Sequence, residues 1–191
     1  MSSPYVYPTC DHFAERRALL HGIYRYPGQS PWGLPRLNKV HIQCSLAESL
    51  TEPDYALGAL AALFLVTGQK GKLIYAKKNV APFAQRQAQP VGAQLQLSRA
   101  VQPGFLTTCR RLVLPAGFQA NLDHQGDLHI GLPKLVGFPA CEGQFDQFEG
   151  LRGLQLTFRC LAPKTMSGQQ RVSFARAYWG CLQFPTGSYL M

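Results

Sequence analysis

Two neighbouring stretches, NKVHIQCSL at residues 38–46 and TEPDYALGALAALFLV at residues 51–66, decide the fold class. In the first stretch apolar and polar residues alternate strictly, which predicts a half-buried β-strand. The second stretch predicts a helix with Thr51 as N-cap and acids in its first turn. Because this helix is apolar nearly all round, we expect it to be well buried.

The same two patterns recur along the chain. They predict further strands at residues 72–76, 91–97, 127–132 and 153–161, and helices at residues 11–26 and 103–114 and after a cap at Ser167. Alternating strands and helices with polar strand faces favour an α+β fold: one antiparallel or mixed sheet with helices packed on one face. We expect residues 1–33 to form an N-terminal helix and loop extension, and residues 34–191 to form a single domain.

The charge is unevenly distributed. The chain has 191 residues, with 19 Lys and Arg against 10 Asp and Glu, and a formal net charge of +9. No acid occurs from Tyr55 to Leu122, a segment that carries eight cations: Lys70, Lys72, Lys77, Lys78, Arg86, Arg99, Arg110 and Arg111. Such a segment repels itself and has little reason to be ordered alone, and phosphate backbones are the commonest partner for it. A solvated basic face without a partner is the alternative.

Other function classes find little support. No apolar run approaches the roughly 18 residues of a membrane span. The six cysteines form no Cys-x-x-Cys pair, so they resemble small buried hydrophobes in a reducing compartment. The chain contains neither a phosphate-binding P-loop nor a Gly-x-Ser-x-Gly elbow, and His41 and Cys44 fall on opposite faces of one strand. We therefore expect no catalytic activity, no cofactor and no metal.

Several motifs in register resemble one ribosomal family. TGQK at 67–70, AKKNVAPF at 76–83 and PVG at 90–92 are similar to a conserved block of the fifth large-subunit ribosomal protein, which holds 5S rRNA in the central protuberance of bacterial ribosomes. DHQG at 123–126, RGLQLT at 152–157, PRL at 35–37 and FP at 184–185 resemble further family motifs in the same order. The resemblance extends from about Leu34 to Pro185.

The resemblance implies a structural constituent of the large ribosomal subunit, with an rRNA-binding α+β domain. The implied partners are large-subunit rRNA, 5S rRNA where the system has one, P-site tRNA, and neighbouring proteins of the central protuberance and the small-subunit head. The loop at residues 77–86 would approach the elbow of P-site tRNA. The residues expected to bind RNA are Lys39, Lys70, Lys72, Lys77, Lys78, Asn79, Phe83, Gln85 and Arg86.

The chain also departs from the family pattern. Gln94 and Ser98 stand where the family has cations, and the loop after Pro115 is short. Such a loss of RNA-facing charge is typical of a divergent organellar ribosome, so we expect a mitochondrial location, with another organelle or the cytoplasm as alternatives. A protein-interaction scaffold that has lost its 5S rRNA contacts, or a free RNA-binding module, are the alternative functions. We expect the surface around Gln94, Ser98 and the loop after Pro115 to meet protein or solvent.

Structural roles are expected for four other residues. Arg110 and Arg111 should lie near the C-terminal end of a helix, where cations complement the helix dipole. Gly126 and Gly131 should permit tight backbone turns.

Overall fold

The computed structural model describes residues 36–46, 54–83, 85–116, 120–134, 138–144, 148, 151–161 and 167–184. The helix expected at residues 11–26 and the Thr51 cap lie outside these ranges.

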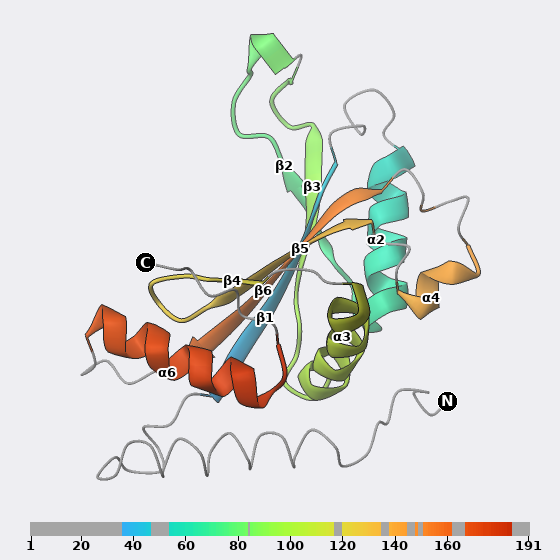
Figure 1. Ribbon diagram of the computed structural model, residues 1–191. Helices are drawn as coiled ribbons and strands as arrows, with labels where there is room; N and C mark the ends of the chain where they lie inside the picture. The colour runs from blue at the N-terminus through green and yellow to red at the C-terminus, as the bar shows by residue number, and fades with distance from the viewer. Residues whose placement is uncertain are drawn as a thin grey trace. The chain divides into compact units, whose positions relative to one another are not determined.

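The described strands form one antiparallel six-stranded sheet in the order β2-β3-β1-β6-β5-β4 (Figure 1). The strands are β1 (Arg36–Ser45), β2 (Lys72–Tyr75), β3 (Pro90–Gln96), β4 (Ala120–Leu122), β5 (Leu128–Lys134) and β6 (Arg152–Leu161). The described helices are α2 (Asp54–Thr67), α3 (Gln102–Ala116), α4 (Pro139–Glu142), α6 (Gly168–Cys181) and the short 3-10 helix η3 (Ala81–Phe83). The predicted α+β class is confirmed, whereas β4, α4 and η3 were not expected.

The chain divides into two compact units, and the second unit comprises residues 41–97 and 131–156. In this unit β3 lies between β2 and β1 and pairs antiparallel with both. The predicted alternation of β1 is confirmed, because Ile42 and Cys44 are buried while Gln43 and Ser45 are exposed. β3 approaches β1 so closely that a Cβ on Gly92 would lie 2.9 Å from the Cys44 carbonyl oxygen. One face of this three-stranded ladder is thus apolar and the other is polar.

Helix α2 packs against β2 and β3 and also contacts α4. Ala56, Ala59 and Leu63 are buried on one face. On the opposite face Leu57 is 64% exposed and Phe64 is 48% exposed. The prediction of a well-buried helix is therefore wrong for this face, because an all-round apolar composition says nothing about how many faces the rest of the chain covers.

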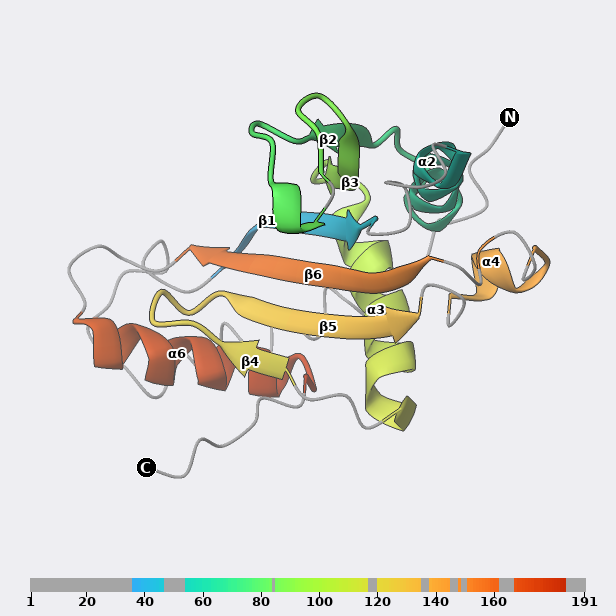
Figure 2. The ribbon, with the colours of Figure 1, turned by 90° about the horizontal axis from the view of Figure 1, so that it is seen from above.

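The first unit comprises residues 1–40, 98–130 and 157–191, and aromatic side chains fill its core. The Trp179 ring lies 5.9 Å from Phe158, 5.2 Å from Tyr178 and 5.8 Å from Phe184, measured between ring centroids. These rings come from β6, α6 and the segment after α6, and Figure 2 shows α6 alongside β4. The predicted cap at Ser167 is confirmed, since its side chain and that of Gln170 form a reciprocal capping box. The aromatic cluster and the cap together fix α6 on the sheet.

The turn between β4 and β5 requires a glycine at position 126. Gly126 has φ +87°, and a Cβ there would lie 2.8 Å from the Ala175 Cβ on α6. Its carbonyl oxygen also accepts a hydrogen bond from Trp179 Nε1 at 3.3 Å. The expected turn role is confirmed for Gly126 but is wrong for Gly131, which lies within β5 without a positive φ and with open space around a built Cβ.

Helix α3 is longer than its sequence pattern indicated. It continues through Pro115 to Ala116, so Arg110 and Arg111 lie near its middle and its last turn holds no basic residue. The expected pairing of these arginines with the C-terminal end of the helix is therefore wrong. Pro115 donates no backbone hydrogen bond to the carbonyl four residues earlier, so the helix ends one residue beyond it.

The cysteines described as buried behave as small hydrophobes, as expected. Burial raises the pKa of the Cys44 thiol to about 11. Desolvation also raises the pKa of Cys109 and of Cys141. All three are free thiols. Because burial disfavours the thiolate, which is the nucleophilic form, their reactivity is low.

Candidate nucleic-acid interface

The connection between β2 and β3, residues 76–89, forms a projecting hairpin tip (Figure 1). Backbone hydrogen bonds close it at two levels: Ala76 N to Gln89 O at 2.8 Å, and Val80 N to Gln85 O at 2.9 Å. The Asn79 side chain adds a third closure, since its Oδ1 accepts a bond from Gln87 N at 2.6 Å. The expectation that this segment has little internal order without a partner stays a prediction, and these hydrogen bonds within the tip oppose it.

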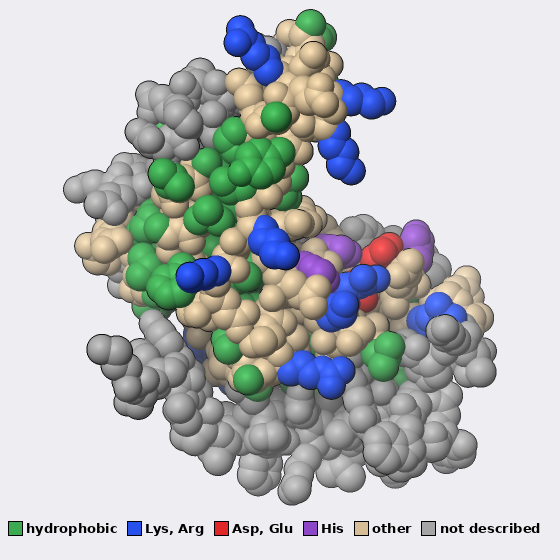
Figure 3. Space-filling view, turned by 180° about the vertical axis from the view of Figure 1, so that it is seen from behind, with side chains coloured by type: hydrophobic (Ala, Val, Ile, Leu, Met, Phe, Trp, Pro, Cys, Tyr) green, Lys and Arg blue, Asp and Glu red, His purple; other side chains and the backbone are tan. Residues whose placement is uncertain are grey.

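The closed hairpin tip presents cations to the outside. Lys77, Lys78 and Arg86 are all exposed, and Figure 3 shows Lys and Arg side chains projecting from this end of the unit. Gln85 is half-buried and contributes its backbone to the inner closure. The backbone of Phe83 lies in η3, and its side chain is outside the described part. Of the predicted tip residues, three are therefore available to phosphates as charges, while Asn79 and Gln85 shape the tip.

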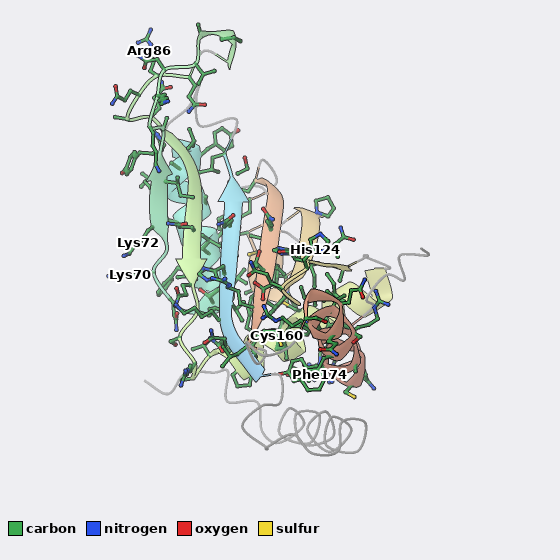
Figure 4. The ribbon with its side chains drawn as sticks, turned by 90° about the vertical axis from the view of Figure 1, so that its left-hand side faces the viewer. Lys70, Lys72, Arg86, His124, Cys160 and Phe174 are labelled. Carbon is green, nitrogen blue, oxygen red and sulfur yellow. The ribbon has the colours of Figure 1, made fainter. Side chains whose placement is uncertain are left out.

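A second site lies on the polar face of the β2-β3-β1 ladder, where an open groove of about 370 Å³ is found. The register places Lys72 on β2 beside Gln94 on β3, and Gln94 beside Gln43 on β1. Two residues further along the strands, Gln96 pairs with His41. Lys70 lines the same groove, and Figure 4 shows it next to Lys72, at the opposite end of the unit from Arg86.

The groove therefore combines two cations with a row of neutral amides. Among the described residues no Asp or Glu lines it, so none of these side chains opposes a phosphate. Glutamine amides can donate to and accept from base edges, whereas lysines bind phosphates as point charges. Sequence reasoning identified Lys70 and Lys72 but missed Gln43 and Gln96, because neutral amides carry no charge signal and only the strand register brings them together.

The first unit contributes a separate polar strip. Lys39 is exposed on the polar side of β1, as expected. On β5 and β6, His129 Nδ1 lies 3.1 Å from Thr157 Oγ1, and Arg159 Nε donates to Asp127 Oδ2 at 3.2 Å. Asp127 also accepts from Cys160 N at 2.9 Å, so its carboxylate holds the half-exposed Arg159 in place. Arg159 is thus a positioned cation that the sequence did not single out.

Two other kinds of site are not found within the described ranges. No group of three His, Cys, Asp or Glu side chains gathers there. No described helix combines the length and the apolar character that crossing a membrane requires.

The chain is similar to proteins of one kind. It is 32% identical over 146 residues to the large ribosomal subunit protein uL5 of Herpetosiphon aurantiacus, covering 73% of this chain and 80% of that protein. It is 32% identical over 140 residues to uL5 of Thermus thermophilus, covering 70% and 76% of the two chains, and 31% identical over 134 residues to uL5c of Mesostigma viride, covering 67% and 72%. No family model matches the chain.

Proposed function

The chain belongs to the uL5 family of large ribosomal subunit proteins, and we propose that it is a structural, non-enzymatic constituent of the large ribosomal subunit that binds rRNA. The observation that carries the proposal is the hairpin tip, whose three exposed cations stand in a segment without a single acid. Polyanion binding neutralises the self-repulsion of that segment.

The proposed mechanism is positioning. Lys77, Lys78 and Arg86 bind phosphates, and the hydrogen-bonded closure of the tip lowers the conformational entropy that binding removes. The groove acts as a second contact, in which Lys70 and Lys72 hold the backbone. The amides of its lining can read a base edge, which adds orientation to affinity.

The assignment of partners extends this proposal. We propose that the loop at residues 77–86 faces P-site tRNA or large-subunit rRNA within the central protuberance, that 5S rRNA is a further partner where present, and that residues 34–191 act as one rRNA-binding domain. The family motif AKKN at 76–79 supports the first point. We also propose a mitochondrial ribosome as the location. The relatives include bacterial and chloroplast proteins, and the loss of cations at Gln94 and Ser98 supports an organellar ribosome.

A protein-interaction scaffold is the second candidate function. The observation that favours it is the neutral side chain of Gln94 at the centre of the groove, where a cation would strengthen RNA binding. The two functions differ in their salt dependence, because amides release no counterions from RNA.

The test is the salt dependence of binding between the full chain and large-subunit rRNA. If Lys70, Lys72, Lys77, Lys78 and Arg86 each neutralise one phosphate, log affinity should fall against log salt with a slope of about −3.5 to −4.5. The variant Lys77→Ala/Lys78→Ala should reduce that slope by about 1.4 to 1.8.

The matched control is Arg99→Ala/Arg176→Ala, which removes two exposed cations elsewhere and the same net charge. Its slope should stay close to that of the parent chain. Equal slopes for both double variants would show that only net charge matters, and a flat response in the parent chain would overturn RNA binding itself.

A further inference from the structure

The polar strip of the first unit holds one arginine in a fixed orientation. Arg159, on β6, donates from Nε to Asp127 Oδ2 at 3.2 Å, directly before β5. The carboxylate is itself anchored, because the Asp127 side chain is only 11% exposed and its Oδ1 accepts a hydrogen bond from Cys160 N at 2.9 Å. A buried, hydrogen-bonded carboxylate therefore orients the Arg159 side chain, which is 49% exposed.

Neighbouring side chains extend the polar strip on the same face of the sheet. Phe158, between Thr157 and Arg159, is buried, so Thr157 and Arg159 both lie on the polar side of β6. Thr157 Oγ1 lies 3.1 Å from His129 Nδ1 on β5, and His129 pairs with Asn121 on β4. Figure 3 shows basic, acidic and histidine side chains adjoining one another on the face of the molecule seen there. These neighbours add hydrogen-bonding groups beside Arg159 but no further Lys or Arg.

The terminal edge of the Arg159 guanidinium stays available to a ligand. Within the described part of the chain its hydrogen bond is made through Nε, and its two Nη groups have no partner there. These groups form a rigid planar fork that fits two acceptors side by side. Phosphate, carboxylate and the guanine edge that carries O6 and N7 each offer such a pair.

Charge distinguishes between these three ligands. A phosphate or a carboxylate on the fork would bring a second negative group close to the Asp127 carboxylate, which already balances the charge of Arg159. The guanine edge is an uncharged pair of acceptors and meets no such repulsion. We propose that Arg159 binds O6 and N7 of a guanine in RNA, and that Asp127 is the positioning residue that holds the fork.

The inference rests on the proposed RNA binding and adds a base preference to it. A-form RNA hides this guanine edge in a deep, narrow major groove, so the guanine lies in a loop or a bulge. Leu161, two residues after Arg159 on β6, is 58% exposed and offers apolar surface to the unstacked base. A phosphate contact would have no use for such a surface.

The probe is a hairpin RNA whose loop presents one guanosine among uridines, and its binding to the full chain is followed by fluorescence anisotropy. Replacing the guanosine by adenosine should weaken binding by about 5- to 100-fold. Loops with 7-deazaguanosine, which lacks N7, or 2-aminopurine, which lacks O6, should also bind more weakly. Inosine keeps both acceptors and should bind as guanosine does.

Two variants test the residues. Arg159→Lys keeps the charge but loses the fork, so the preference for guanosine over adenosine should vanish while the salt slope of rRNA binding stays unchanged. Arg176→Lys makes the same change at an exposed position on α6 and should keep the preference. Asp127→Asn removes a negative charge, which favours phosphate binding, yet it should reduce the guanosine preference because the fork loses its anchor. If circular dichroism shows that Asp127→Asn does not fold, Arg159→Lys decides the test.

Three results would overturn the inference. They are equal affinity of the parent chain for all loops, a guanosine preference that survives Arg159→Lys, and tighter binding by folded Asp127→Asn with the preference intact. Equal affinity for all loops would leave a phosphate or a protein carboxylate as the ligand of Arg159. That result with the expected salt slope leaves the proposed function standing, whereas a flat salt response contradicts the proposed function itself.

Discussion

Replacement of Gly126 by alanine tests the packing of the first unit at a single atom. An L side chain at φ +87° costs about 1–2 kcal/mol of backbone strain. The new Cβ would also lie 2.8 Å from the Ala175 Cβ, so α6 or the turn must shift. That shift disturbs the hydrogen bond from Trp179 Nε1 to the Gly126 carbonyl. We expect Gly126→Ala to lower the free energy of unfolding by about 2–4 kcal/mol in total.

The assay is equilibrium unfolding in urea, followed by far-UV circular dichroism and by the fluorescence of the buried Trp179. Ala175→Gly removes the opposing Cβ and should cost about 1–2 kcal/mol by itself, through helix propensity and a lost buried methyl group. In that background Gly126→Ala should cost only its backbone strain, which leaves a coupling of about 1–2 kcal/mol in the double-mutant cycle.

The control for this cycle is Gly131→Ala. It adds a methyl group to β5 at a position with open space and no positive φ, so stability should change little or rise slightly. A stability of Gly126→Ala equal to that of the parent, or a coupling of zero, would refute the close approach of this turn to α6.

Three further predictions concern single contacts. Ser167→Ala removes the N-cap of α6 and should lower the free energy of unfolding by about 1 kcal/mol in urea titrations, while Ser45→Ala, at an exposed position on β1, serves as the control. Because burial raises the pKa of Cys44 to about 11, its neutral thiol contributes stability that is complete below the ordinary thiol pKa and is lost as pH rises towards 11. Thermal melts from pH 8 to 11 should show the decline, and Cys44→Ala should make it shallower, with Cys109 and Cys141 accounting for the remainder. Asn79→Ala removes the bond to Gln87 N and should speed tryptic cleavage of the hairpin tip several-fold, and a cleavage rate equal to that of Gln125→Ala would show that the backbone bonds suffice.

Local chemistry made much of the fold predictable. The alternation around Ile42 and Cys44 fixed one strand and its buried face, since each side chain on a strand points opposite to the next. Ser167 predicted the start of α6, because its capping box depends only on residues within one turn. By contrast, β4 and α4 are three and four residues long, too short to show any period.

The candidate site was predictable in its charges but not in its assembly. Lys77, Lys78 and Arg86 stand out because they lie in a segment without acids. The row of Lys72, Gln94 and Gln43 depends on the register of three strands far apart in the chain, which no local pattern encodes. Gln94 was expected to meet protein or solvent, and its place in that row makes it a candidate RNA contact. The exposure of one face of α2 was not predicted for a related reason: composition indicates an apolar helix but not the number of neighbours that cover it.

The strand order has a consequence for the synthesis of the chain. β1 has one neighbour that follows soon after it, β3, and one near the C-terminal end, β6. The ladder β2-β3-β1 can therefore form once residue 97 has emerged from the translating ribosome. The other edge of β1 stays open until residues 152–161 arrive, and open edges pair with whatever strand they meet. The last strand to be made is the one that closes the sheet, so a chain that stops before residue 152 keeps two unpaired edges, on β1 and on β5, where the finished protein has a continuous sheet.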